Sequence, residues 1–137
     1  MTKYNTNLAS EFYVLSVLYR MGHNASLTLG NKKSVDIIVI PGKGEPITID
    51  VKGLAGKTSW PVDNVDFEKV DKNHFLIFVS YLDKITDPLV LPEVYIVPLN
   101  KLKPFVYISP KKDRKVLPLS RLRKDGSQYK DAWHLLK

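Results

Sequence analysis

Residues 34–52 read SVDIIVIPGKGEPITIDVK, and this stretch decides the fold. Two runs of β-branched residues, Ser34 to Ile40 and Pro46 to Lys52, show the alternation that is typical of β-strands. The residues between them, Pro41-Gly42-Lys43-Gly44, favour a tight turn. The sequence therefore predicts an antiparallel hairpin.

This hairpin would bring two carboxylates together. With the turn centred on Lys43, the numbers of paired residues sum to 86, so Asp36 lies opposite Asp50. Their Cβ atoms would be roughly 5 Å apart, and the ionised groups would repel each other. A divalent cation would remove this repulsion, and Mg²⁺ favours carboxylates, carbonyls, waters and phosphate oxygens. Lys52, on the same strand face as Asp50, could orient a water or stabilise developing phosphate charge; a simple Asp50–Lys52 surface pair is the alternative.

A helix is expected before the hairpin, from Asn5 to Met21, with Gly22 as its stop. Glu11 points from the middle of its apolar face, where a carboxylate is costly unless it is paired. Glu11 is therefore either half of a buried salt bridge or a member of the acidic cluster. The apolar residues at helical spacing are Leu8, Phe12, Leu15, Leu18 and Tyr19, and those that surround Glu11 on the predicted face are Leu8, Val14, Leu15 and Leu18.

The rest of the chain reads as an alternation of short strands and helices, which indicates one α/β (α+β) domain over residues 1–137. We expect a leading helix and a mixed sheet, with the core over about residues 5–98 and a basic part over residues 99–137. A Gly-rich loop through Gly53 and Gly56 would contain Trp60-Pro61. The expected strands are Ala25–Leu29, His74–Tyr81 (central in the sheet), Glu93–Pro98, Phe105–Ser109 and Lys115–Leu119, the last two paired; a polar turn is expected at 30–33, and helices at 67–72, 119–124 and 127–136.

The net charge of +7 lies entirely in the second half of the chain. Residues 1–68 hold seven basic and seven acidic side chains, whereas residues 99–130 hold ten and two. Such a stretch favours a polyanionic partner, of which nucleic acid is the commonest; a solvated lysine-rich surface is the alternative. Trp60 either stacks on a base or closes the core. The candidate nucleic-acid contacts are Lys57, Trp60, Lys111, Lys112, Arg114, Lys115, Arg121 and Arg123.

Composition excludes several other kinds of site. The chain has no cysteine, so it has no disulfide, thiolate nucleophile or cysteine-ligated zinc. Its three histidines, His23, His74 and His134, lack the spacing of a zinc site. Its apolar runs fall short of the roughly 20 residues of a membrane helix, and the start of the chain lacks an apolar signal, so we expect a cytoplasmic protein.

The order Glu11, Asp36, Asp50-Val51-Lys52 resembles the PD-(D/E)XK nuclease superfamily, which includes restriction enzymes and Holliday-junction resolvases. Residues 48–52 look like its central motif, and residues 34–38 look like its preceding aspartate strand, although Val35 stands where the family often has proline. The resemblance covers residues 5 to about 81. It implies a restriction-endonuclease-like core, in which a helix precedes an antiparallel meander that carries the site.

The resemblance also implies a function, a metal-dependent endonuclease acting on nucleic acid, with DNA favoured over RNA. Asp36 and Asp50 would bind Mg²⁺, with Mn²⁺ as the alternative ion, and the Val51 carbonyl would be a further ligand. Lys52 would position the attacking water. Glu11 would support the cluster or bind a second ion. The alternative is a catalytically inactive module that binds nucleic acid or a partner on the same scaffold, and a homodimer is one way for so small a domain to enclose a duplex.

Overall fold

The computed structural model describes residues 2–28 and 35–137, and the turn expected at 30–33 lies outside them. The helices and strands follow in the order α1 (Lys3–Arg20), β1 (Ala25–Leu27), β2 (Ile37–Val39), β3 (Ile47–Leu54), β4 (Ser59–Pro61), β5 (His74–Ser80), β6 (Glu93–Pro98), β7 (Tyr107–Ile108), β8 (Lys115–Pro118) and α2 (Leu119–Asp125). Short 3₁₀ turns occupy Leu99–Lys101, Lys103–Phe105, Ser127–Tyr129 and Trp133–Leu135.

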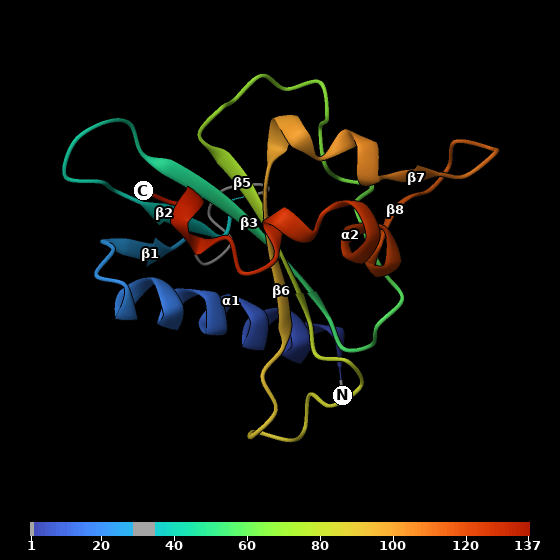
Figure 1. The fold of residues 1–137 in the computed structure, drawn as a ribbon, viewed down its shortest axis with the longest axis horizontal. Helices are drawn as coiled ribbons and strands as arrows, with labels where there is room; N and C mark the ends of the chain where they lie inside the picture. Colours follow the sequence, from blue (N-terminus) through green and yellow to red (C-terminus); the bar gives the residue numbers. More distant parts are fainter. Residues whose placement is uncertain (1, 29–34) are drawn as a thin grey trace.

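These strands form two sheets. The larger has the order β1-β2-β3-β5-β6 and is antiparallel except between β3 and β5; the smaller has the order β4-β8-β7. Helix α1 packs along the larger sheet against β3 and β1, and α2 lies beside β8 on the other side (Figure 1). The predicted fold class, a leading helix with a mixed sheet and an antiparallel hairpin, is confirmed.

The hairpin has the predicted register. Its pairs are Ile37 with Ile49, Ile38 with Thr48, and Val39 with Ile47, each of which sums to 86. The ladder stops at Ile37, whereas β3 runs on to Leu54 beside β5. The second half of β3 is therefore not covered by β2, and this edge becomes the wall of a pocket.

The larger sheet separates two cores, because successive side chains of a strand point to opposite faces. On β5, Phe75, Ile77 and Val79 pack toward α1, while Leu76 and Phe78 pack toward the smaller sheet. Every residue of β5 is buried, and the strand is paired on both sides. Its prediction as an interior strand is confirmed.

The predicted apolar face of α1 is confirmed at Val14 and Leu18 but wrong at Phe12 and Tyr19. The buried residues are Thr6, Ser10, Val14 and Leu18, whereas Phe12 and Tyr19 are 54% and 57% exposed. The reason is Gly53 on β3: a Cβ there would collide with Ser10 Oγ and lie 3.0 Å from the Thr6 carbonyl oxygen. The helix therefore approaches the sheet through small polar residues over a glycine, which rotates the larger apolar stripe outward.

Two predicted helices are absent from the part of the chain that the structure describes. Around 67–72, the side chains of Asp66 and Asp71 accept the backbone N–H groups of Glu68 and Asn73, and such local bonds compete with a helix. Within 127–136, the chain pairs with β6 through Lys130 and Asp131, and Asp131 has a φ of 51°. Tertiary pairing thus leaves only the two 3₁₀ turns.

The predicted Gly-rich loop is also partly wrong. Gly53 belongs to β3, and Ser59–Pro61 forms β4, which pairs with β8. A strand of three residues carries too little periodicity to be recognised from sequence. In the fold it joins the C-terminal third to the edge of β3.

Candidate active site

A pocket of about 390 Å³ lies at the uncovered edge of β3. It is bounded by the first half of α1, the end of the hairpin, and the turn that follows β4. It contains all five residues predicted as the reaction centre. Its lining comprises Lys3, Asn7, Glu11, Asp36, Asp50, Val51, Lys52, Gly53, Trp60, Pro61, Asp63 and Asn64.

Asp36 stands where the β2 ladder ends. Its backbone N–H donates to the Ile49 carbonyl at 2.8 Å, and its Oδ2 accepts the Val51 N–H at 2.8 Å. The carboxylate thus accepts a backbone N–H group of β3 that lies beyond the end of the β2 ladder. This bond holds Asp36 beside Asp50, as the hairpin register predicted.

Asp50 and Lys52 point from β3 into the same pocket. Lys52 Nζ lies 3.3 Å from Asp50 Oδ2 and donates to Asn64 Oδ1 at 3.0 Å. The side chains of Lys52 and Asp50 are only 16% and 6% exposed. The alternative of a simple surface pair is therefore wrong.

The environment of Asp50 disfavours its charged form. Burial raises the pKa of this carboxyl to about 7, Lys52 opposes the shift, and Asp36 adds to it. Burial also raises the pKa of Glu11, with a further contribution from Asp36. Carboxyl groups with raised pKa values in a pocket are typical of functional sites.

Glu11 lies at the margin of the buried face of α1 and lines the pocket. It is close enough to Asp36 for the two charges to interact. Within residues 2–28 and 35–137, however, no three or more His, Cys, Asp or Glu side chains converge as a ready metal cage. The Asp36–Asp50 pair is therefore the candidate metal-binding centre, and Glu11 lines the same pocket beside it.

This pair suits a hard divalent cation. Mg²⁺ is commonly held by one or two carboxylates while waters and substrate phosphates complete its shell. A cation beside Asp50 would offset both the repulsion from Asp36 and the burial that raises the Asp50 pKa. The donor set therefore fits Mg²⁺ or Mn²⁺ as well as a two-carboxylate site can.

The structure contradicts base stacking on Trp60. This side chain is fully buried, packs edge-on against Phe78 at a ring-centroid distance of 5.2 Å, and donates from Nε1 to the Val79 carbonyl at 3.2 Å. A base cannot reach a ring without exposed surface. Trp60 closes the core behind the pocket, which was the other interpretation of its sequence position.

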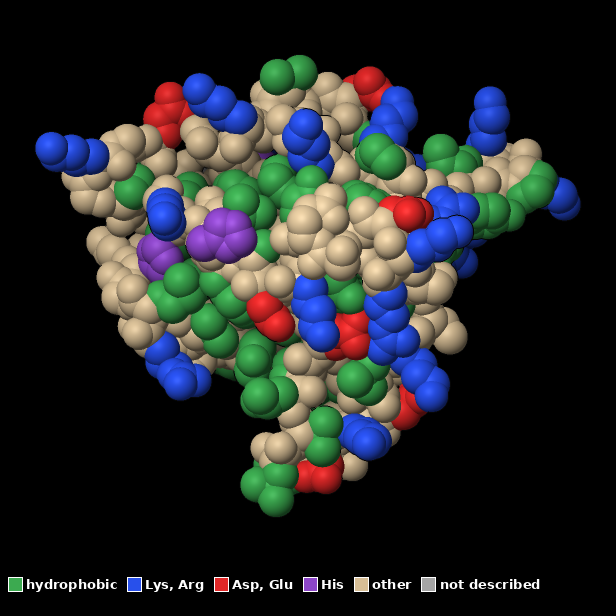
Figure 2. Space-filling model, in the orientation of Figure 1, with side chains coloured by type: hydrophobic (Ala, Val, Ile, Leu, Met, Phe, Trp, Pro, Cys, Tyr) green, Lys and Arg blue, Asp and Glu red, His purple; other side chains and the backbone are tan. Residues whose placement is uncertain are grey.

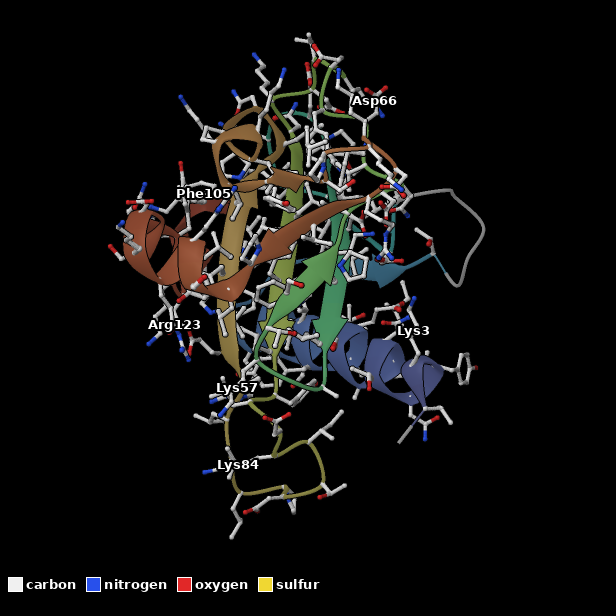
Figure 3. The ribbon with its side chains drawn as sticks, turned by 90° about the vertical axis from the view of Figure 1, so that its right-hand side faces the viewer. Lys3, Lys57, Asp66, Lys84, Phe105 and Arg123 are labelled. Atoms are coloured by element: carbon white, nitrogen blue, oxygen red, sulfur yellow. The ribbon has the colours of Figure 1, made fainter. Side chains whose placement is uncertain are left out.

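Lys57 also lies away from the pocket. It is exposed on the turn between β3 and β4, near Lys84 and at the opposite end of the molecule from Asp66 (Figure 3). On the same turn, Ala55 accepts the Asp83 N–H at 2.8 Å, so the segment belongs to the β5–β6 end of the fold. Lys57 therefore does not line the pocket, and its role as a nucleic-acid contact stays a prediction.

The β7–β8 hairpin carries a first cluster of predicted basic contacts and joins the wall of the pocket at Asp63. The cluster consists of Lys111, Lys112, Arg114 and Lys115. Arg114 Nε lies 3.4 Å from Asp63 Oδ2, and the Lys115 N–H donates to Asp63 Oδ1 at 2.7 Å. Lys111 and Lys112 are exposed on the connection between the two strands. Figure 2 shows basic side chains gathered over this hairpin and α2.

The second cluster of predicted basic contacts, Arg121 and Arg123 on α2, contacts other side chains of the protein. Arg123 forms two hydrogen bonds with Glu93, at 2.8 and 2.9 Å, and the Arg121 guanidinium lies 5.6 Å from the centre of the Tyr107 ring. Lys3 lines the pocket. Arg123 lies on the opposite side of the molecule from Lys3 (Figure 3). Arg123 is thus placed as a link between α2 and β6.

Sequence reasoning missed Lys3, Asn7 and Asn64. Lys3 and Asn7 precede Glu11 by eight and four residues, so the helical repeat could have placed them on the same side of α1. Asn64 carried no sequence signal, because the turn that presents it is positioned by β8, some fifty residues later.

Comparison with known proteins gives one kind of match. No family model and no curated protein matches the sequence. Among solved structures, the fold is similar to that of a bacterial homing endonuclease, I-Ssp6803I, with a TM-score of 0.61 and 17% identity. The match covers 99% of this chain and 93% of the other. At this identity the match establishes a shared fold.

No helix in the described residues is long and apolar enough to span a membrane.

Proposed function

We propose that this protein is a Mg²⁺-dependent endonuclease of the PD-(D/E)XK type that hydrolyses phosphodiester bonds in DNA. The observation that carries the proposal is the buried Asp50, whose pKa is raised to about 7 beside Asp36 while Lys52 lies 3.3 Å away. A chain selected for stability alone would avoid this arrangement, because burying charged groups costs free energy. A fold shared with a protein described as a homing endonuclease supports the same class of reaction.

In this proposal, Asp36 and Asp50 would hold the ion, and the Val51 carbonyl would be a further ligand. The ion would supply Lewis-acid stabilisation of the negative charge that develops on the phosphoryl group. The Lys52 ammonium donates a hydrogen bond to the attacking water and keeps it in line with the phosphorus. Glu11 contributes negative charge at the outer side of the pair.

The β7–β8 hairpin would bind the substrate backbone. Lys111 and Lys112 are exposed, and Arg114 and Lys115 are joined through Asp63 to the wall of the pocket. Contacts of lysine and arginine with phosphates supply affinity without sequence preference. Arg123 is left out of this surface because it is held by Glu93.

The test is a calorimetric titration of Mg²⁺, and separately Mn²⁺, into the wild type and Asp50→Ala, with a cleavage panel of DNA and RNA substrates beside it. Saturable binding and DNA cleavage should both be lost in Asp50→Ala, because one of the two carboxylates is gone. Lys111→Ala/Lys112→Ala should keep metal binding but weaken DNA binding, with a smaller salt dependence. Nucleic-acid binding that ignores Mg²⁺ and survives Asp36→Ala, with no cleavage, would instead identify a non-catalytic binding module.

A further inference from the structure

We propose that Asn64 is the positioning residue that holds the Lys52 ammonium in place for this reaction, a role that rests on the proposed function. Strand β8, in the C-terminal third of the chain, would then support the reaction centre by holding the turn that carries Asn64. The inference depends on the contacts among the side chains of Lys52, Asp50 and Asn64, and on the turn that carries Asn64.

The first step is the geometry at Lys52. Its Nζ has two partners at hydrogen-bonding or ion-pair distance, Asn64 Oδ1 at 3.0 Å and Asp50 Oδ2 at 3.3 Å. An ammonium has three donors, so two fixed partners leave one donor for substrate or water. A lysine held only by Asp50 could move its ammonium around that one contact, because its four-carbon stem is flexible.

The second step is the chemistry of the amide. An ammonium can only donate, so Asn64 must present its carbonyl oxygen to Lys52. This oxygen is a neutral acceptor. It fixes the lysine without adding another negative charge to a pocket whose lining already includes four carboxylates, those of Glu11, Asp36, Asp50 and Asp63. A fifth carboxylate there would repel both the Asp36–Asp50 pair and the phosphate of a substrate.

The third step is the rigidity of the turn. Val62 and Val65, on either side of Asn64, are buried, and the Val65 N–H donates to the Val62 carbonyl at 3.1 Å. The Val62 N–H donates to the Lys115 carbonyl at 2.9 Å, and the Lys115 N–H donates to Asp63 at 2.7 Å. Strand β8 thus fixes the turn at Val62 and Asp63 through Lys115, and a fixed turn can position a side chain that a mobile loop could not.

The first experiment does not depend on activity. The ¹⁵Nζ signal of the Lys52 ammonium, assigned with Lys52→Arg, is recorded by NMR in the wild type, Asn64→Ala, Asn64→Asp and Asn73→Ala. Asn73 is a matched control, because its side chain also forms a single loop hydrogen bond, to Glu45 at 2.6 Å. The signal should shift or broaden in Asn64→Ala, remain sharp in Asn64→Asp, which keeps an oxygen acceptor, and be unchanged in Asn73→Ala.

The second experiment measures cleavage. Asn64→Ala should lower kcat by about 10-fold or more with little change in KM, since loss of a group that orients a site residue typically costs 10–100-fold. In a Lys52→Ala background the same substitution should have no further effect, because its action passes through the lysine.

An unchanged Lys52 signal in Asn64→Ala would overturn the inference, whatever the activity. So would equal losses from Asn64→Ala with and without Lys52. A wild type that cleaves no substrate, yet loses the ordered ammonium signal in Asn64→Ala, would leave the positioning intact and remove the proposed function instead.

Discussion

Two ion pairs of the larger sheet have opposite electrostatic characters. Arg123 on α2 holds Glu93 on β6, and this hydrogen bond lowers the pKa of Glu93. Lys52 holds Asp50 on β3, yet burial raises the pKa of Asp50 to about 7. The cationic side chain is 51% exposed in the first pair and 16% in the second.

The difference shows what burial and a second carboxylate do to a salt bridge. In the first pair, the half-exposed Arg123 guanidinium stays hydrated and donates two hydrogen bonds to Glu93, which outweigh the burial of that carboxylate. The pair adds a modest link between two elements. In the pocket, Asp50 loses solvation and faces Asp36, so one lysine does not fully stabilise its charge. The first pair is suited to holding the fold together, and the second to binding a cation.

The largest contrast is expected in cleavage. Lys52→Ala should slow DNA hydrolysis by about 10²–10³-fold, the usual loss when a group that stabilises developing charge is removed. Arg123→Ala should leave the rate within about twofold, because its partner Glu93 is outside the pocket. Initial rates in Mg²⁺, with circular dichroism to verify folding, measure both. Equal losses in the two variants would abolish the distinction between the pairs.

A smaller contrast is expected in stability without metal. Folded Asp50 keeps its proton up to about pH 7, whereas the ordinary value for its carboxyl is 3.8. Between these values the folded state binds more protons, so the Asp50 contribution to stability falls as the pH rises. Asp50→Asn should therefore raise the free energy of unfolding at pH 8 by about 1–4 kcal/mol, and by much less at pH 4. Urea unfolding in EDTA at both pH values tests this; a gain that is larger at pH 4 would contradict it.

The smallest effect, with the opposite pH dependence, is expected at the other pair. The pKa of Glu93 lies below its ordinary 4.5, so its contribution to stability is present above that value and is lost as the pH falls through the lowered one. Arg123→Ala should destabilise the protein at pH 7 by about 0.5–1 kcal/mol, a small value because the guanidinium is half exposed. Urea unfolding at pH 7 and at a series of pH values below 4.5 should show the gap closing as the pH falls. A gap that widens there would be evidence against this link.

Much of the candidate site was predictable because its information is local. Alternation over residues 34–52 set the strands, the Gly-containing turn set the register, and the register placed Asp36 near Asp50. The basic hairpin was likewise predicted from composition. Its engagement with Asp63 was not, because that contact joins residues about fifty positions apart.

The errors share a physical cause. The apolar stripe of α1 was placed on the sheet, but Gly53 draws Ser10 inward and leaves Phe12 exposed. Trp60 was considered for stacking, but it is fully buried between the sheets. In each case a neighbour distant in sequence decided which face of an element meets the core, and periodicity alone cannot identify that neighbour.

The sequence by itself determined the hairpin, its register and the pair of carboxylates, because strand pairing across a short turn is specified within some twenty residues. Only the tertiary structure decided that β2 stops at Ile37, that Asp36 then accepts the Val51 N–H, and that β8 holds Asn64 against Lys52. These features need contacts between distant segments. Such contacts form only when a core packs on each face of the larger sheet, and local sequence patterns cannot predict them.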